Sequence, residues 1–224
     1  MTDLILFREG FVPSKSITLA KEEFLHLSAL RRKDLPSMIE IRDGLGNIHF
    51  YNYQPKSKEL EFVKTDSLPL KNKRSKIAIA LPKGNRLDFF LQKVTEMGVT
   101  NVNFLLFRHS VRREFNLERA KKIVKEAASQ SKQVELLQLE ISEFSSWIVE
   151  NQNASIVFHP HSKLELSQTS LKNKIPVIGP EGGFHLEEEG LLEELKVPKV
   201  CLPGGILRTE TAGLVAGALL QYAT

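Results

Sequence analysis

Ile178-Gly179-Pro180-Glu181-Gly182-Gly183-Phe184 opens the stretch that decides the fold of this 224-residue sequence, and Leu202-Pro203-Gly204-Gly205-Ile206-Leu207-Arg208-Thr209-Glu210-Thr211-Ala212 closes it. Both segments follow short runs rich in β-branched residues, at 175–178 and 197–202, and both lead into patterns typical of helices. Exposed amides in glycine-rich turns can bind an anionic group or the edge of a purine. The two turns therefore predict a small-molecule pocket lined by backbone.

These turns match neither of the common nucleotide-binding loops. No Gly-Lys-Ser/Thr follows them, as a Walker A loop requires, and no Gly-x-Gly-x-x-Gly opens a helix after the first strand of a dinucleotide unit. Each glycine pair alone is compatible with a tight turn that only reverses the chain. Because two such pairs occur at strand ends, with Arg208 and Glu210 beside the second, we favour the pocket.

Arg208 and Glu210 are the charged residues of the second segment. Glu210 suits the positive end of a helix dipole, with Thr209 as the N-cap, so a structural role remains open for it. Arg208 follows the apolar pair Ile206-Leu207, where a charged side chain is costly unless it meets a carboxylate, a phosphate or a substrate. Arg208 is therefore the stronger functional candidate.

Residues 77–222 alternate between strand and helix patterns. The predicted strands cover residues 77–81, 102–107, 156–158, 175–178 and 200–202, and the predicted helices cover residues 86–97, 116–133, 144–149, 186–195 and 209–222. This alternation implies an α/β domain with a mostly parallel sheet covered on both faces. Ligands of such sheets bind beyond the carboxyl ends of the strands, here at loops 158–160, 179–184 and 203–208. We interpret Glu187-Glu188-Glu189 as a solvated helix start.

The first 72 residues show a different rhythm. Strands are predicted at 4–7, 38–42, 48–53 and 60–63, a helix at 22–30, and a hairpin turn at 43–47. Short strands with one small helix predict a compact β-barrel-like module. The charged, turn-rich segment 70–76 marks the boundary, so the predicted domains are residues 1–72 and 73–224.

Composition excludes several classes of protein. No apolar run reaches the roughly 20 residues that span a bilayer, and residues 1–8 lack the pattern of a signal peptide. The single cysteine, Cys201, excludes an internal disulfide and a cysteine-based zinc site, and the six histidines do not show metal-ligand spacing. We expect a cytoplasmic protein with no metal and no membrane partner.

Charge is distributed unevenly along the sequence. Residues 1–134 carry a net charge of +10 and residues 135–224 carry −6, within an overall +4. Lysine and arginine in the first part could follow the phosphate backbone of a nucleic acid. A solvated basic surface is the alternative.

Several segments together resemble the RsmE family of SPOUT-class methyltransferases, over nearly the whole chain. The two glycine-rich segments carry the strongest similarity. The other matching segments are His26–Arg31, Arg86–Val99, Arg108–Ser110 and Glu126–Ser131. Two segments depart from the family pattern. Leu202-Pro203-Gly204-Gly205 stands where the family usually has Leu-Gly-Pro-Arg, and Ser131-Lys132-Gln133 replaces a Ser-Gly/Lys-Arg ending.

The resemblance implies a PUA-like RNA-binding β-barrel domain in residues 1–72. It implies a SPOUT methyltransferase domain with a C-terminal trefoil knot in residues 73–224, and a homodimer with S-adenosylmethionine (S-adenosyl-L-methionine) bound in the knot. The implied activity is methylation of uracil N3 of a uridine in 16S (small-subunit) ribosomal RNA, either naked or in the assembled small subunit.

The resemblance also implies roles for individual residues. Arg208 would stabilise charge on the uracil or orient the uridine phosphate, and Glu210 would orient Arg208 or accept the N3 proton. The implied cofactor-binding residues are Phe158, His159, Ile178, Gly179, Pro180, Glu181, Gly182, Gly183, Leu202, Gly204, Ile206, Leu207, Thr211 and Ala212. The implied RNA-binding residues are Arg8, Arg31, Arg32, Lys83, Arg86 and Arg112.

The sequence bears on two other functions. A non-catalytic RNA-binding ribosome-assembly factor with a vestigial pocket is the alternative, because the usual arginine before Ile206 is missing. A nucleotide hydrolase is disfavoured, since the sequence lacks a phosphate-cradling lysine motif and metal-binding carboxylates.

Overall fold

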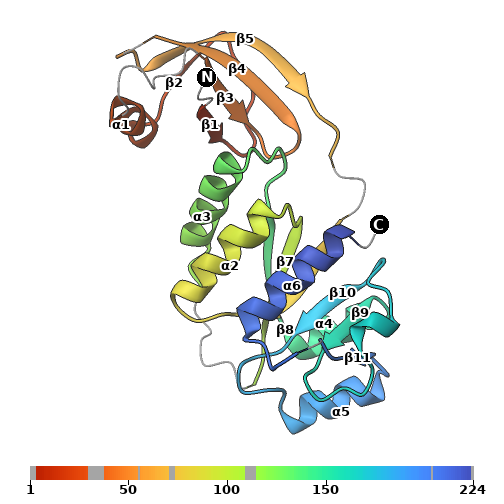
Figure 1. Cartoon of the computed structure of the whole chain (residues 1–224). Coiled ribbons are helices and arrows are strands. Elements are labelled where there is room, and N and C mark those ends of the chain that lie inside the picture. Colours follow the sequence, from red (N-terminus) through yellow and green to blue (C-terminus); the bar gives the residue numbers. More distant parts are fainter. Residues whose placement is uncertain are drawn as a thin grey trace. The chain divides into compact units, whose positions relative to one another are not determined.

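The computed structural model describes residues 4–29, 38–54, 56–70, 74–108, 115–202 and 204–222 (Figure 1). The chain divides into two compact units. The first comprises residues 1–72 and 125–136, and the second comprises residues 73–124 and 137–224. Among the described helices, none combines the length and the apolar character that crossing a membrane requires.

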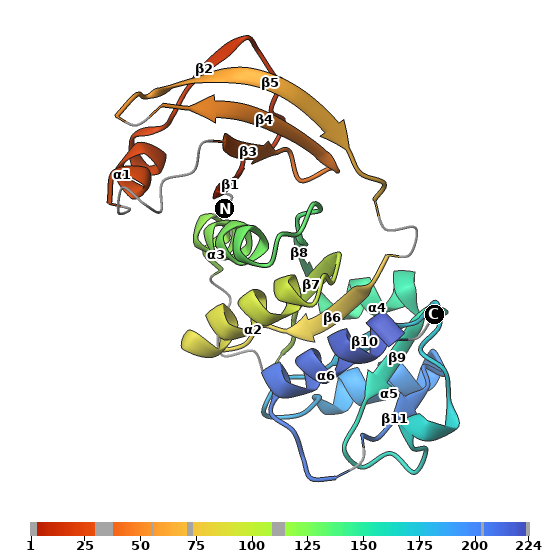
Figure 2. The ribbon, with the colours of Figure 1, turned by 45° about the horizontal axis from the view of Figure 1, so that its top comes forward.

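A five-stranded sheet forms the first unit, in the order β1-β3-β4-β5-β2. Its elements are β1 (Leu4–Phe7), β2 (Ser16–Thr18), α1 (Lys21–Ala29), β3 (Met38–Arg42), β4 (Asn47–Tyr53) and β5 (Glu59–Ser67). β1 and β3 run parallel, and the other neighbours are antiparallel. The sheet is strongly curved (Figure 2). The four predicted strands and the helix are confirmed, whereas the three-residue β2 escaped prediction.

The hairpin between β3 and β4 follows from its turn residues. Asp43 Oδ1 accepts hydrogen bonds from the backbone N–H groups of Leu45 at 2.7 Å and Asn47 at 3.1 Å. Gly44 and Gly46 have φ angles of 81° and 97°, which residues with a side chain rarely adopt. The predicted turn at 43–47 is confirmed.

Polar contacts fasten residues 125–136 to the rest of the first unit. Ser129 Oγ donates a hydrogen bond of 2.6 Å to the backbone of β1. The buried Arg42 donates from Nη1 to the carbonyl oxygens of Lys132 at 2.7 Å and Gln133 at 2.6 Å. A charge-assisted bond to each carbonyl compensates for the burial of the guanidinium.

A six-stranded sheet forms the second unit, in the order β11-β9-β10-β6-β7-β8, with every neighbouring pair parallel. Its strands are β6 (Lys76–Ala80), β7 (Asn101–Leu106), β8 (Gln138–Glu143), β9 (Ser155–Phe158), β10 (Ile175–Ile178) and β11 (Lys199–Val200). Its helices are α2 (Asn85–Glu96), α3 (Leu117–Gln130), α4 (Phe144–Asn151), the 3₁₀ helix η2 (Leu166–Gln168), α5 (Leu186–Glu194) and α6 (Thr209–Tyr222), and the second half of α3 belongs to the first unit. The predicted α/β class and parallel sheet are confirmed.

Helices cover both faces of this sheet (Figures 1 and 2). α2 and α6 lie side by side on one face, and α4 and α5 lie on the other. Two glycines let α6 approach the sheet closely. A Cβ atom on Gly213 would lie only 2.6 Å from Ile79 and Phe90, and one on Gly217 would lie 3.0 Å from Met97. This packing fixes the start of α6 at the edge where the predicted loops lie.

The strand order creates a crevice at that edge. The chain runs outward from β6 through β7 to β8, and then returns to the other side of β6 to form β9, β10 and β11. Ligands of open α/β sheets bind where the strand order reverses in this way, beyond the carboxyl ends of the strands.

Candidate functional site

A cavity of about 630 Å³ lies beyond the carboxyl ends of β9, β10 and β11. Its volume falls within the range of about 300–1,000 Å³ that is typical of small-molecule sites. The residues that line it are Arg86, Phe158, His159, Pro160, His161, Ile178, Gly179, Pro180, Glu181, Gly182, Gly183, Phe184, Leu202, Gly204, Gly205, Ile206, Leu207, Arg208, Thr209 and Ala212.

Thirteen of the fourteen expected cofactor residues line this cavity, all except Thr211. Thr211 is exposed on α6, because successive residues of a helix point about 100° apart and Thr209 and Ala212 share the face toward the cavity. The structure therefore does not bring Thr211 to the cavity with the others, and its binding role stays a prediction. The binding roles of the other thirteen stay predictions.

The first glycine turn, residues 179–184, is built by close packing. A Cβ atom on Gly179 would lie 2.8 Å from the ring of Phe184, so a larger residue there would force the ring or the turn to shift. The Phe184 ring packs against Phe107 and Phe144, with centroid distances of 5.5 and 5.8 Å. Thr209 Oγ1, at the start of α6, donates a 3.2 Å hydrogen bond to the carbonyl of Gly179. The two ends of the opening stretch therefore meet at the cavity.

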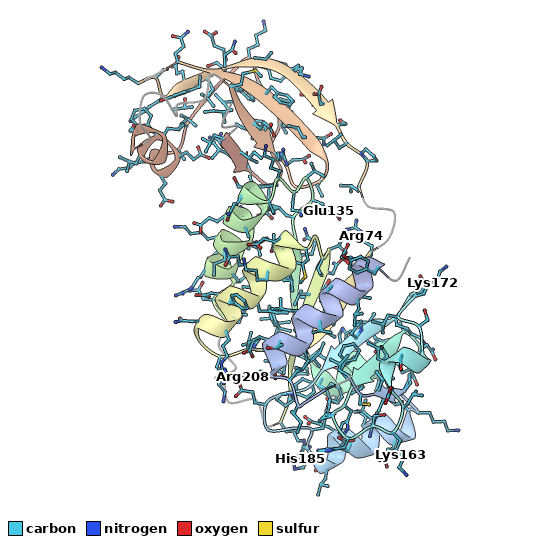
Figure 3. All side chains as sticks on the ribbon, viewed as in Figure 1. Arg74, Glu135, Lys163, Lys172, His185 and Arg208 are labelled. Atoms are coloured by element: carbon cyan, nitrogen blue, oxygen red, sulfur yellow. The ribbon has the colours of Figure 1, made fainter. Side chains whose placement is uncertain are left out.

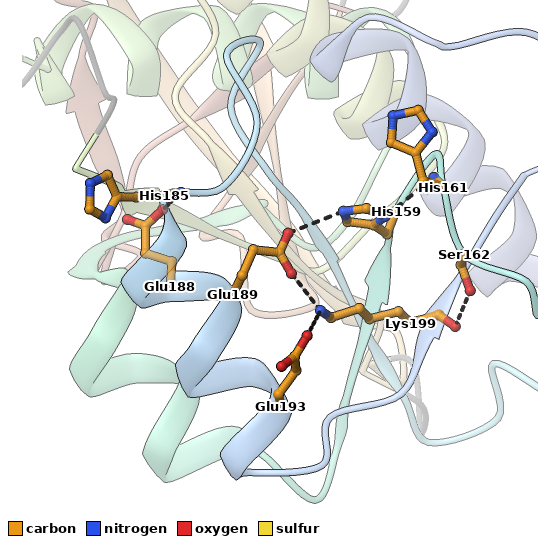
Figure 4. A network of polar contacts seen from close by, with 8 residues as sticks. All are labelled: His159, His161, Ser162, His185, Glu188, Glu189, Glu193 and Lys199. Atoms are coloured by element: carbon orange, nitrogen blue, oxygen red, sulfur yellow. Dashed lines mark hydrogen bonds and ion pairs between the residues drawn. The ribbon is translucent and has the colours of Figure 1, made fainter.

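His159 belongs to a polar network beside the cavity (Figure 4). Its Nδ1 accepts a hydrogen bond from the backbone N–H of His161 at 3.2 Å, so Nε2 carries the proton that is donated to Glu189 Oε1 at 3.1 Å. Glu189 is held in turn by Lys199 of β11. The ring of His159 is stacked on Phe184, with 22° between the ring planes. Since both ring nitrogens are used, His159 offers the cavity a ring surface and no free nitrogen.

The interpretation of residues 187–189 as a solvated helix start was wrong for Glu188. Glu188 is only 5% exposed, and its two carboxylate oxygens accept hydrogen bonds from the backbone N–H groups of Arg108 at 2.8 Å and His185 at 2.7 Å. One buried carboxylate thus joins the end of β7 to the loop that carries the first turn. The expectation holds for Glu187, which is exposed.

Arg208 lies at the N-terminal end of α6 and lines the cavity (Figure 3). Its side chain is exposed, so it does not pay the desolvation cost that its apolar neighbours suggested, and that part of the prediction was wrong. Within the described residues, its side chain makes no ion pair or hydrogen bond. It is therefore available to a ligand or substrate at the cavity.

Glu210 is 7% exposed in the first turn of α6. Its Oε1 lies 3.8 Å from Nε of Arg86, and its buried Oε2 does not find a hydrogen-bond partner among the described atoms. Glu210 therefore faces Arg86 and not Arg208 in this structure, and the two alternative roles expected of it, orienting Arg208 or accepting the N3 proton, stay predictions.

Arg86 is the main residue of the cavity that sequence reasoning placed elsewhere. It lies in the first turn of α2, lines the cavity and pairs with both Glu181 and Glu210. Lys83 lies 3.6 Å from Glu181. The available signal was the position of Arg86 just beyond the carboxyl end of a buried strand, where sheet ligands bind. Pro160, Phe184 and Gly205, which lie in the predicted ligand loops but were not among the expected cofactor residues, also line the cavity, and so do His161 and Thr209, which lie outside those loops.

The other candidate RNA contacts are Arg8, which the structure describes, and three arginines that it does not describe. Arg8 is held within the first unit by Glu23, with Nη2 2.5 Å from Oε2, and it also donates to the carbonyl of Thr18. Arg31, Arg32 and Arg112 lie outside the described residues. Their contacts with RNA stay predictions. In the part of the chain that the structure describes, no cluster of histidine, cysteine, aspartate and glutamate suits a metal ion.

Comparisons with known proteins agree with this architecture. A family model described as an RNA methyltransferase domain matches residues 69–221. Ribosomal RNA small subunit methyltransferase E of Buchnera aphidicola is 29% identical over 219 residues, which cover 91% of this chain and 86% of that protein. The protein of the same name from Rickettsia conorii is 32% identical over 154 residues, which cover 65% of this chain and 63% of the relative. That alignment therefore spans less than two thirds of the Rickettsia protein.

A solved structure is similar along almost the entire chain. It is that of a ribosomal RNA small subunit methyltransferase E from Neisseria gonorrhoeae bound to S-adenosyl methionine. The match has a TM-score of 0.82 and 25% sequence identity, and covers 98% of this chain and 97% of the other. The resemblance found in the sequence is confirmed.

Proposed function

The chain belongs to the RNA methyltransferase domain family, and we propose that it transfers a methyl group from S-adenosylmethionine to uracil N3 of a uridine in 16S ribosomal RNA. The relatives named as small-subunit methyltransferases support the substrate class. The observation that carries the proposal is the cavity, which gathers loops from three parallel strand ends and the start of α6.

The lining of the cavity fits S-adenosylmethionine. Ile178, Leu202, Ile206 and Leu207 supply an apolar wall of the kind that covers an adenine ring. The glycine-rich segment 179–183 brings backbone groups to the cavity, where they can hydrogen-bond the polar parts of a nucleoside. We propose that these residues hold the cofactor, with His159 and Phe158 beside them.

The chemistry assigns roles to Arg208 and Glu210. When bound, S-adenosylmethionine supplies a methyl group on a sulfonium sulfur, and the sulfur keeps the bonding electron pair as the methyl group leaves. Neutral uracil carries a proton on N3, so the N3–H bond must break as the N3–C bond forms. We assign to the exposed Arg208 the stabilisation of negative charge on the uracil ring. We assign the proton to Glu210, which does not line the cavity of the free protein and has a buried Oε2, so this role requires that substrate binding expose the carboxylate.

The remaining parts of the proposal concern assembly and RNA. We propose that the first unit is a PUA-like RNA-binding module, on the strength of the family resemblance alone, because the net charge of this unit is only +1 and most of the basic excess lies in residues 73–124 of the second unit. Arg8, Arg31, Arg32, Lys83 and Arg112 stay candidate phosphate contacts. A trefoil knot in the second unit, a homodimer and a cytoplasmic location complete the proposal, which rests here on family membership.

Transfer of tritium from S-adenosylmethionine to small ribosomal subunits and to naked 16S ribosomal RNA tests the activity. We expect label on one uridine, and mapping the modified nucleotide by mass spectrometry checks that the methyl group is on N3. Label on another base or on ribose would refute the assigned position.

Two further measurements separate the proposal from a vestigial pocket. Calorimetry should detect binding of S-adenosylmethionine to the purified chain, and absence of binding at high protein concentration would favour a non-catalytic assembly factor. Arg208→Ala should abolish transfer while it leaves cofactor binding intact, because Arg208 is assigned to the RNA substrate. Unchanged transfer would remove Arg208 from the catalytic group.

A further inference from the structure

Arg86 connects two segments of the cavity that are far apart in sequence. Its Nη1 pairs with Glu181 in the first glycine turn, and its Nε lies 3.8 Å from Oε1 of Glu210 at the start of α6. The side chain is 39% exposed and lines the cavity. Lys83, by contrast, pairs with Glu181 and does not pair with Glu210.

Glu210 needs a compensating cation because its carboxylate is buried. Its Oε2 is without a hydrogen-bond partner among the described atoms, and Arg208 does not pair with it although it is only two residues away in sequence. A buried carboxylate is costly unless a cation or hydrogen bonds offset its loss of water. A guanidinium has several N–H groups in a fixed plane, so it can serve two carboxylates at once, as Arg86 does here.

We infer that Arg86 is a positioning residue of the methyl transfer. This inference rests on the proposed function, and it assigns to one guanidinium the task of holding the turn 179–184 in register with Glu210. The turn contains residues that are proposed to bind the cofactor, and Glu210 is the proposed proton acceptor. Loss of Arg86 therefore weakens cofactor binding through Glu181 and lowers turnover through Glu210.

The local charges argue against the alternative that Arg86 contacts an RNA phosphate. Arg86 and Lys83 stand against Glu181 and Glu210, so the two cations are matched by two carboxylates. A phosphate that approached Arg86 would meet both carboxylates. Phosphate contacts gain affinity when a cation displaces the counterions that are condensed on the nucleic acid. The guanidinium of Arg86 is already neutralised by carboxylates, so it would gain little from such a contact.

The test compares five variants of the full chain, one of which is Arg86→Lys. Arg86→Gln, Glu210→Gln and the double variant form a mutant cycle, and Arg119→Gln is the matched control. Arg119 is also an arginine paired with a carboxylate of α2, Asp88 at 2.5 Å, but it does not line the cavity. The measurements are the cofactor Kd by calorimetry, kcat at saturating substrates, the Tm, and RNA affinity at several salt concentrations.

We expect Arg86→Gln to raise the cofactor Kd at least fivefold and to lower kcat at least tenfold, with RNA affinity and its salt dependence unchanged. The double variant should turn over within threefold of Glu210→Gln, and its Tm loss should be smaller than the sum of the single losses, since both changes break one pair. Arg86→Lys should recover part of the cofactor affinity, because an ammonium keeps the charge but reaches one carboxylate.

Three results would overturn the inference. One is additive losses of both kcat and Tm in the double variant. Another is an unchanged cofactor Kd in Arg86→Gln together with weaker RNA binding and a salt slope reduced by about one, which identifies a phosphate contact. The third is an equal rise of the cofactor Kd in Arg119→Gln, which would mark a general effect of charge. If the parent chain does not bind the cofactor, the proposed function fails, and the Tm cycle still decides whether Arg86 and Glu210 are coupled.

Discussion

The two glycine turns that wall the cavity are built in different ways. In the first turn, Gly179 lies against the ring of Phe184, and Glu181 is paired with Arg86. In the second turn, Cβ atoms added to Gly204 and Gly205 would have nothing within 4 Å, and Ile206 is 77% exposed. Contacts within the chain hold the first turn in place, and we call this turn, residues 179–184, the first wall of the cavity. The second turn, residues 204–208, is the second wall, and its side chains are exposed until a ligand covers them.

Because of this difference, the two walls of one cavity should contribute differently to the stability of the free protein and to its affinity for a ligand. A wall that is fixed before the ligand arrives lowers the ordering cost of binding, and its residues contribute to the stability of the free protein. A wall whose side chains are exposed contributes little until a ligand covers them. Substitutions that disrupt the packed contacts of the first wall should therefore lower both stability and affinity, and substitutions in the second wall should lower affinity alone.

The largest loss of stability is expected for Glu188→Ala, which removes the carboxylate that fixes the loop leading from the first wall into α5. Both backbone N–H groups that Glu188 binds, those of Arg108 and His185, would lose a charged acceptor. Hydrogen bonds to charged groups contribute about 1.5–3 kcal/mol each, so we expect a loss of about 3 kcal/mol in the free energy of unfolding. Urea denaturation measures it, with a lower midpoint and an unchanged slope.

Glu187→Ala is the control for this prediction. Glu187 lies one residue away on the same helix and bears the same charge, but it is exposed and pairs with the exposed side chain of Arg108. Surface pairs of this kind contribute about 0–1 kcal/mol. Equal losses from the two substitutions would show that charge at the start of α5 matters and the buried contacts do not.

Prediction from sequence succeeded where the chemistry is local. The buried strands and the amphipathic helices of the second unit follow from runs and periods of apolar residues, and so do the loops at the strand ends. β8 was missed because it is an edge strand with mostly exposed side chains, from Gln138 to Glu143, and it lacks an apolar run. The residues 125–136 join the first unit through Arg42 and Ser129, which nothing in the helical period of α3 announces.

The candidate site was predicted in the same uneven way. Glycine turns after strands are visible in the sequence, so most cavity residues were found. The partners of Arg86 lie 95 and 124 residues away, and Glu188 meets a backbone group 80 residues away. Contacts over such separations depend on the strand order, which periodicity does not specify. The sequence therefore indicated that Glu210 orients Arg208 or accepts the proton, and that Arg86 contacts RNA, but it did not indicate the pairing of Arg86 with Glu210.

A smaller effect is expected for Gly179→Ala, which adds one methyl group to the tightest point of the first wall. The new Cβ atom would lie 2.8 Å from Phe184, so the ring or the turn must shift. Overpacking of this size costs about 1–3 kcal/mol, or a Tm lowered by roughly 2–4 °C per kcal/mol at this chain length. The cofactor Kd should rise as well, because the displaced ring borders the cavity.

Gly182→Ala shows whether the effect comes from the contact or from the loss of a glycine. Gly182 is in the same turn, and a Cβ atom there would have nothing within 4 Å. Its Tm should stay within about 1 °C of the parent, since surface substitutions away from special features change stability by at most about 0.5 kcal/mol. If Gly182→Ala lowered the Tm as much as Gly179→Ala, the turn would be strained as a whole, and the ring contact would lose its special role.

The smallest effect on folding is expected for Ile206→Ser in the second wall. The side chain is 77% exposed in the free protein, so its replacement by a small polar group should leave the Tm unchanged within about 1 °C. Ile206 lines the cavity, however, and a ligand that covers part of it gains from the apolar area removed from water, at about 25 cal/mol per Å². Covering about 40 Å² is worth about 1 kcal/mol, which predicts a roughly fivefold higher cofactor Kd. Thermal unfolding without S-adenosylmethionine measures the Tm of the free protein, and the rise of the Tm on addition of S-adenosylmethionine reports the cofactor Kd. A lower Tm without cofactor would mean that the second wall is already packed, and the contrast between the two turns would disappear.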